Sequence, residues 1–268
     1  MIKVSDLNII ESKLNLEAVW ILARREVYEF WRNKTRLISS LVQGVLFLFV
    51  FSAALTTTSS TIVINGINVD PRAYAASGIS AIVILFTGIF GGMGVMRDKM
   101  FGFMKELIVA PVSRRTLMLG KTLGVALQTL TQVFIIVILG LIFGYYGYDF
   151  SIIWKILLIL PVALLASVGI VGMGLTISTR MRDFQSFGLI QTFIVMPMFL
   201  ISGAFYTLSG PIGLVSMFNP FTYSVDLFRV VLVGASFFPI WLDLLVVIAF
   251  GTVLILLGAR SFSTMEVS

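Results

Sequence analysis

Long stretches without a charged side chain dominate the hydrophobic pattern of this chain. Asp, Glu, Lys and Arg are absent from residues 37–69, 73–96, 122–148, 156–179, 184–225 and 244–259. A helix needs about 20 consecutive apolar residues to cross the hydrocarbon core of a bilayer. Within that core, a helix satisfies all of its own backbone hydrogen bonds. The pattern therefore predicts an all-α integral membrane protein.

The runs divide into six predicted transmembrane helices, at about 37–56, 73–96, 119–145, 156–179, 184–207 and 238–259. They form one transmembrane domain, residues 37–268, after a cytoplasmic segment, residues 1–36. With the N-terminus inside, the inner segments hold sixteen Lys and Arg residues and the outer segments three. Cytoplasmic loops are the ones that retain such residues. We therefore expect a multi-pass protein of the cell membrane (in a prokaryote, the cytoplasmic membrane), with both termini in the cytoplasm.

Composition narrows the function classes. Hydrophobic residues make up 58% of the chain and charged residues 12%, about half the charged share of a soluble domain. The net charge of +6 is spread over several inner loops, which suits anionic lipid head groups better than nucleic acid. The chain has no Cys and no His, which argues against a zinc site or triad-type hydrolysis. We expect no metal site, no catalytic residue and no nucleic-acid partner.

An amphipathic helix is predicted before the first span. Apolar side chains recur at helical spacing through residues 14–36, interrupted by basic ones. This pattern is typical of a helix that lies in the inner membrane interface and contacts membrane lipids. The residues assigned to it are Trp20, Arg24, Arg25, Trp31 and Arg32. The alternative is a solvated basic lead-in that only fixes the topology.

The inner loop after the second span mixes charges with large apolar side chains. Residues 98–110 alternate in this way, and Pro111 should end their helix. Exposed Met, Phe and Leu among charges favour a short helix that docks into a groove on a partner. The alternative is a helix that packs against the inner surface of the same chain.

The outer region after the fifth span is uncharged but broken by glycine and proline. Between residues 184 and 225 there is too much apolar sequence for one span and too little for two. We predict short re-entrant helices over about 210–236 that enter the outer leaflet partway. Asp226 and Arg229, three residues apart on a helix, are expected to pair with each other.

Glycine-containing motifs offer two further interpretations. Gly120-Lys121-Thr122 looks like the end of a phosphate-binding loop, but Arg115 stands where the first glycine is required. We therefore expect no nucleotide site in this chain. Glycine pairs at a spacing of four residues allow helix backbones to approach closely. They are Gly88/Gly92, Gly120/Gly124 and Gly140/Gly144.

Together these segments resemble the type 2 ABC transporter permeases, the membrane subunits of ATP-driven exporters of drugs, lipids and glycans. The resemblance covers nearly the whole chain. In the inner loop it rests on Arg97, Gly102, Leu107, Pro111, Val112, Ser113 and Lys121. In the outer region it rests on residues 202–206 followed by Pro211, Asn219, Pro220, Tyr223, Asp226 and Arg229, with Gly203 inside the first segment.

The resemblance implies a partner. Residues 98–110 would be a coupling helix that docks into a separate ABC ATPase subunit, which holds ATP and Mg²⁺. Two permease subunits, identical or closely related, would pair with two ATPases, and substrate would pass along the interface between the permeases. The coupling residues implied are Arg97, Asp98, Phe101, Gly102, Lys105, Glu106, Leu107, Pro111, Ser113 and Arg114.

The residues in the spans indicate the substrate class only broadly. Many Phe and Met side chains accompany scattered amides, including Gln43, Gln128, Gln132 and Gln191. This mixture favours an amphipathic or lipid-like molecule, with drug-like molecules and glycans as further family substrates. The alternative function is a secondary transporter or channel driven by an ion gradient, which would use ionisable groups inside the spans. Asp243, near the outer start of the last span, is the candidate for such a group.

Overall fold

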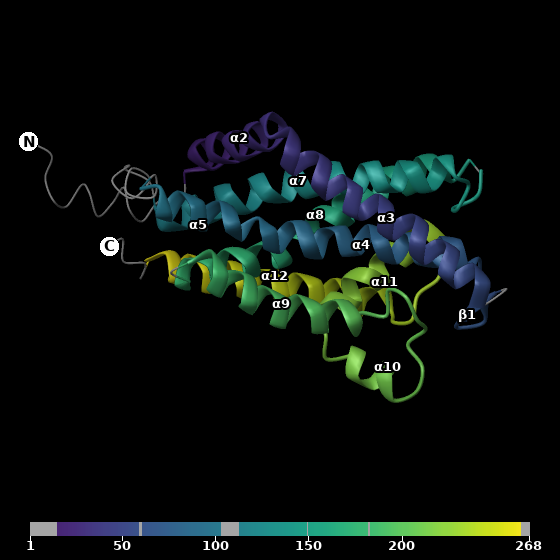
Figure 1. Ribbon diagram of the computed structural model, residues 1–268. Coiled ribbons are helices and arrows are strands. Elements are labelled where there is room, and N and C mark those ends of the chain that lie inside the picture. The colour runs from purple at the N-terminus through teal and green to yellow at the C-terminus, as the bar shows by residue number, and fades with distance from the viewer. Residues whose placement is uncertain (1–14, 59–60, 103–112, 149, 182, 264–268) are drawn as a thin grey trace, which may run out of the picture.

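The computed structural model describes residues 15–58, 61–102, 113–148, 150–181 and 183–263. Across these ranges the regular elements are helices joined by turns and loops, apart from one short hairpin (Figure 1). Five helical segments are long and apolar enough to cross a membrane: Leu37–Thr57, Pro71–Met100, Arg114–Ile142, Ile152–Arg180 and Ile240–Phe262. They match five of the six predicted spans.

The fifth predicted span along the chain, 184–207, is shorter than expected. Helix α9, Phe184–Leu200, has 17 residues, and the chain turns after Leu200, whereas hydropathy alone extended the span to residue 207. Gly203 has a φ of 70°, in the left-handed region that glycine adopts readily, so it stands outside the helix. The apolar run therefore continues past the end of the helix into a packed turn.

Helix α4, Pro71–Phe90, occupies the centre of the bundle and continues into α5, Gly92–Met100. In the segment Pro71–Met100, 78% of the most apolar stretch is buried, against 17% for the span in α3, Lys34–Thr58, and for the span in α12, Ile240–Ser263. The first turns of α4 are rich in Ala, Ser and Gly. Small side chains let α3, α7 (Arg114–Ile142), α8 (Ile152–Arg180) and α11 (Pro220–Val233) pack closely around α4.

Two of the three glycine pairs bring helices together. A Cβ on Gly88 would lie 2.8 Å from the Ile170 side chain of α8, and one on Gly92 would strike the backbone of Gly174. The pair Gly120/Gly124 faces α2, as described below. The third pair does not join two helices, because Gly140 and Gly144 face the rings of Tyr146 and Tyr148 in the turn that follows α7.

An outer hairpin was not predicted. Strands β1, Ile62–Ile64, and β2, Ile67–Val69, pair antiparallel around Asn65 and Gly66, whose φ angles are 45° and 85°. Asn-Gly is the preferred dipeptide for a two-residue hairpin turn. The Asn65 side chain donates to the carbonyl of Ser236 at 2.8 Å, which attaches the hairpin to the loop after α11.

Two short helices follow α9, as the broken sequence predicted. Helix α10, Gly210–Ser216, has Pro211 in its first turn, and α11 is capped by Asn219, which accepts a hydrogen bond from the Phe221 amide at 3.1 Å. Tyr223 donates to the carbonyl of Met217 at 2.9 Å. Their depth in a membrane stays a prediction.

Asp226 and Arg229 do not form the predicted ion pair. Arg229 is fully buried, donates to the carbonyl of Gly203, and lies over the Tyr74 ring at 4.0 Å. Asp226 accepts the amides of Phe237 and Phe238, each at 2.9 Å. The turns after α9 and α11 supply these partners, and helical spacing alone cannot reveal them.

Replacing Arg229 with Gln should destabilise the outer half of the bundle. The turn at Gly203 loses a charge-assisted hydrogen bond and the Tyr74 ring loses its cation, a loss of about 2–4 kcal/mol in the free energy of unfolding. Thermal denaturation of the detergent-purified chain measures this loss of stability. Arg72→Gln is the matched control, because Arg72 is half-exposed and pairs loosely with Asp70 at 3.7 Å. Equal shifts for the two variants would contradict this role.

Candidate functional site

Helix α2, Leu16–Arg32, lies within the segment predicted to be an amphipathic helix, and its inward face packs along α7. Its buried residues are Val19, Ala23, Glu26 and Phe30. Ala23 fits against Gly124 of α7, where an added Cβ would lie 2.6 Å from that of Glu26. The opposite face exposes Trp20 and Trp31, each more than half accessible. Arg24 and Arg32 are also exposed, and Arg25 is half-buried. Contact with lipids stays a prediction.

A buried lysine joins three helices. Lys121 of α7 is 2% exposed, and its Nζ lies 2.7 Å from Oε1 of Glu26 in α2 and 2.6 Å from Oδ2 of Asp98 in α5. Burying a charge without a partner costs several kcal/mol, so these groups stabilise the fold only as a set. Gln128, two turns along α7, donates to the backbone carbonyl of Glu26 at 2.8 Å. Lys121 thus anchors α2 and α5 to α7, a role quite different from phosphate binding.

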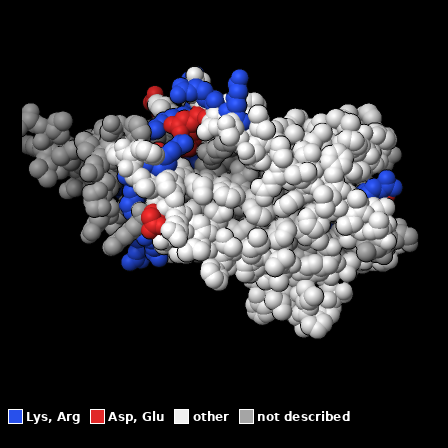
Figure 2. All heavy atoms as spheres, in the orientation of Figure 1, with Lys and Arg blue, Asp and Glu red and all other residues white. Residues whose placement is uncertain are grey.

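A second, more exposed ion pair links α2 to α5. Glu29 receives hydrogen bonds from Arg25 at 3.0 Å and from Arg97 at 2.8 Å. In Figure 2 most of the charged side chains visible from this side gather at the α2 and α5 end, a smaller basic group shows at the opposite end, and uncharged side chains cover the surface between them. We call Glu26, Glu29, Arg97, Asp98 and Lys121 the charge cluster.

The charge cluster lies where the chain enters the predicted coupling segment. Lys105, Glu106, Leu107 and Pro111 lie outside the described residues. Phe101, at the end of α5, is 69% exposed, and Gly102 has a φ of 81°. Ser113 caps α7 by accepting the Thr116 amide at 3.2 Å, and Arg114 is half-buried in its first turn. Of the predicted contact residues, Asp98 faces inward and Phe101 outward.

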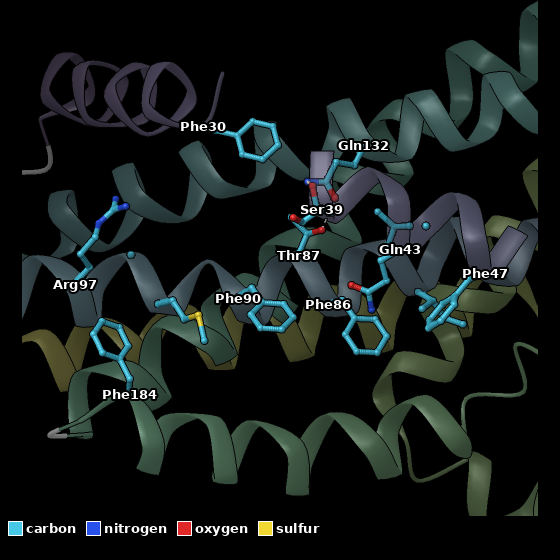
Figure 3. Close-up of a pocket in the computed structure, with 16 residues that line it drawn as sticks. Phe30, Ser39, Gln43, Phe47, Phe86, Thr87, Phe90, Arg97, Gln132 and Phe184 are labelled. Atoms are coloured by element: carbon cyan, nitrogen blue, oxygen red, sulfur yellow. Dashed lines mark hydrogen bonds between the residues drawn. The ribbon is translucent and has the colours of Figure 1, made fainter. Parts of the chain in front are cut away.

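A slot of about 440 Å³ adjoins the charge cluster (Figure 3). Arg97 lies at one end and Phe47 at the other, and Thr87 and Gln132 point toward one another at its middle. Thr87 donates to Gln132 at 2.6 Å, and Gln132 donates to Ser40 at 2.9 Å. The lining residues come from α2, α3, α4, α5, α7 and α9: Phe30, Ser39, Ser40, Gln43, Gly44, Phe47, Ile82, Val83, Phe86, Thr87, Phe90, Met93, Gly94, Arg97, Gln132 and Phe184.

The slot lies between two helices with exposed apolar faces. Val42 and Leu46 of α3 are about half exposed, and Phe193 of α9 is 79% exposed. In Figure 1, α3 and α9 run on the same side of the molecule with α4 between them. Of the four glutamine side chains identified in the spans, those of Gln43 and Gln132 line the slot. Gln128 binds α2, and Gln191 is buried in α9.

Sequence reasoning missed two of the three acidic residues of the charge cluster. Neither Glu26 nor Glu29 was assigned a role in the predicted amphipathic helix. Their spacing of three residues places them on neighbouring positions of α2, but their partners are 95 and 68 residues away. A signal did exist, because Glu26 falls at a position of the buried apolar stripe, where a charge requires a partner.

Comparison with known proteins settles the family. The model of the ABC-2 type transporter family matches residues 17–233, which include both the charge cluster and every residue lining the slot. The chain belongs to this family. The transport permease ycf38 of Pyropia yezoensis is 26% identical over 218 residues, covering 79% of this chain and 72% of that protein. Its namesake in Porphyra purpurea is 22% identical over 215 residues, with the same coverage.

Membership in the ABC-2 family decides the broad function. The chain is a membrane transport subunit rather than a catalytic enzyme, and permeases of this family work with an ATPase partner. The resemblance inferred from the inner loop and the outer helices is thereby confirmed. Substrate, direction of transport and assembly belong to the proposals below.

Lys121→Met should be among the most destabilising substitutions in this ABC-2 permease. It leaves Glu26 and Asp98 buried without their cation, a loss of about 3–5 kcal/mol. The triple variant E26Q/D98N/K121M removes all three charges and should recover part of the loss. Arg25→Met, at a half-exposed pair, should change stability by about 1 kcal/mol or less. Thermal denaturation compares the four proteins, and a K121M melting temperature equal to that of the wild type would contradict the role of Lys121.

Proposed function

We propose that this chain is the permease subunit of an ABC exporter that moves an amphipathic or lipid-like substrate out of the cytoplasm. Drug-like molecules and glycans are the other substrates that the family resemblance offers. A separate ATPase, docked on the segment 98–110, drives transport and holds ATP and Mg²⁺. One observation carries the proposal: Arg97 belongs both to the charge cluster beside that segment and to the wall of the slot.

The proposed coupling runs through helix α5. Motion of the docked segment moves α5, and the bonds of Asp98 to Lys121 and of Arg97 to Glu29 carry that motion to α7 and α2. Helix α2 leads directly into α3 through Asn33, so its displacement changes the position of the slot's α3 wall. The exporter then alternates between inward-open and outward-facing arrangements as the ATPase binds and hydrolyses ATP.

The proposed assembly contains two permeases and two ATPases in the cell membrane. Both termini and the charge cluster face the cytoplasm, which agrees with the basic inner segments. The permeases, identical or closely related, pair through the exposed faces of α3 and α9, so that both slots adjoin the interface. The exposed Trp20 and Trp31 of α2 rest among inner-leaflet lipids.

Variants in the coupling segment test the partnership. After co-purification with the ATPase encoded beside it, the permease complex should show substrate-stimulated ATPase activity and transport into inverted vesicles. Leu107→Ala and Glu106→Ala should each lower both activities at least tenfold without changing the melting temperature of the isolated permease. Arg72→Ala, on the outer side, is the control. Wild-type activity in the coupling variants, or no complex with any ATPase, would refute the proposal.

Cysteine cross-linking tests the pairing face. The chain has no native Cys, so single substitutions report one position each. Val42→Cys or Leu46→Cys on α3, or Phe193→Cys on α9, should yield disulfide-linked dimers in membranes. Leu256→Cys on α12 is equally exposed and should remain monomeric. Dimers formed only through α12 would place the interface on the opposite helix and contradict the proposal.

A further inference from the structure

The shape of the slot restricts what it holds. Its lining residues on the central segment extend from Ile82 to Arg97. At a rise of 1.5 Å per residue this is about 22 Å of helix. A volume of about 440 Å³ distributed over that length describes an elongated groove that is partly open at its side rather than a rounded chamber. One extended chain fits such a space, whereas a compact ring system fills only part of it.

The chemistry of the wall changes along the slot. Phe47 and Phe86 form its outer end, with their ring centroids 6.1 Å apart in an edge-to-face arrangement. Ser40, Thr87 and Gln132 at the middle already satisfy one another with hydrogen bonds. The only charged lining residue in the described part of the chain is Arg97, at the inner end. Aromatic rings therefore follow Arg97 along the slot, Phe90 first, then Phe86 and finally Phe47, and the neutral polar groups stand at the middle of this row.

The cation at the inner end of the slot is Arg97, and its carboxylate partner, Glu29, is shared with a second cation. Glu29 is shared by two guanidinium groups, those of Arg25 and Arg97. Of the donors on Arg97, only Nη2 makes a side-chain hydrogen bond within the part of the chain that the structure describes. Arg97 is 41% exposed at its side chain, so an incoming anion can reach its remaining donors. A carboxylate or phosphate binds such a fork through two parallel hydrogen bonds.

We propose that the slot binds a single-chain amphiphile with an anionic head group, the head on Arg97 and the chain along Phe90, Phe86 and Phe47. The head group competes with Glu29 for Arg97, so binding loosens one of the two links between α2 and α5. This assignment names the substrate class of the proposed exporter. The claim that the bound amphiphile is transported rests on the proposed exporter function, whereas the claim that it binds does not. Binding itself needs no ATPase.

A photoreactive probe tests the assignment. Hexadecyl phosphate carrying a diazirine near its chain end is added to the full-length permease in phosphatidylcholine nanodiscs without the ATPase. After illumination, mass spectrometry should place the label on peptides containing Phe47 or Phe86. Unlabelled hexadecyl phosphate should displace the probe at concentrations at least tenfold lower than hexadecyltrimethylammonium or hexadecyl maltoside. Labelling elsewhere, or equal displacement by all three, would overturn the assignment.

Variants separate a binding role of Arg97 from a structural one. Arg97→Gln should weaken displacement by hexadecyl phosphate about tenfold, and Arg97→Lys should restore part of it. Glu29→Gln should strengthen displacement several-fold, because it frees Arg97 from its competitor. A merely structural ion pair predicts the opposite for Glu29→Gln, so weaker binding in that variant would refute the competition. This test holds even if Arg97→Gln fails to fold.

Two further variants serve as controls. Ser39→Trp places a large ring in the slot from an exposed position of α3 and should abolish labelling of the Phe47 and Phe86 peptides. Arg180→Gln removes an exposed cation at the end of α8, outside the slot, and should leave binding unchanged. If binding follows these expectations but hexadecyl phosphate neither stimulates the ATPase nor is transported, the exporter proposal fails and the binding site stands.

Discussion

The buried ammonium group of Lys121 is the constraint on which the α2 and α5 end of this permease depends. Its two carboxylate partners lie on different helices, Glu26 on α2 and Asp98 on α5. Separating any one of the three groups leaves a charge in a medium that solvates it poorly. The helices α2, α5 and α7 therefore move together at this point or not at all. Gly120 and Gly124 add to this constraint, because they let α2 approach α7 closely enough for the pair to form.

The face of α7 that holds Lys121 also presents two glutamine side chains that form hydrogen bonds with neighbouring helices. Gln128, seven residues further, holds the backbone of Glu26, and Gln132 holds Ser40 at the start of α3. Positions separated by seven and four residues lie on one side of a helix. Helix α7 therefore fixes the end of α2 and the beginning of α3 as one unit. Because Gln132 also binds Thr87 of α4, this unit reaches the middle of the slot.

The sequence predicts this fold well where one physical requirement dominates. Crossing a bilayer demands long uncharged runs, so five spans follow from charge spacing alone. The prediction fails where a helix end or a turn lies inside an uncharged apolar run, because the length requirement does not place such boundaries. The end of α9 at Leu200 falls inside an apolar run, because its turn is packed against other apolar groups. The hairpin around Asn65 lies in another such run, where its Asn-Gly turn was the overlooked signal.

The sequence identified several candidate site residues, but it did not identify the side chains with which they pair. Arg97 and Lys121 stood in the inner motif that carried the resemblance, yet their partners Glu29 and Glu26 come from a helix distant in sequence. The expected pair of Asp226 and Arg229 failed for the same reason. Local spacing offered each side chain a neighbour worth a few tenths of a kcal/mol, and the tertiary fold offered buried backbone groups that bind more strongly.

Adjacent residues on α5 face two different environments. Asp98 enters the buried triad, whereas Arg97 reaches Glu29 and the inner end of the slot. A rotation of α5 about its axis cannot move one of these contacts without moving the other, since both belong to the same helical turn. In the proposed coupling, occupation of the slot and displacement of the coupling segment therefore act on the same turn of α5. By linkage, whatever favours one arrangement of that turn at the slot favours it at the inner surface to the same extent.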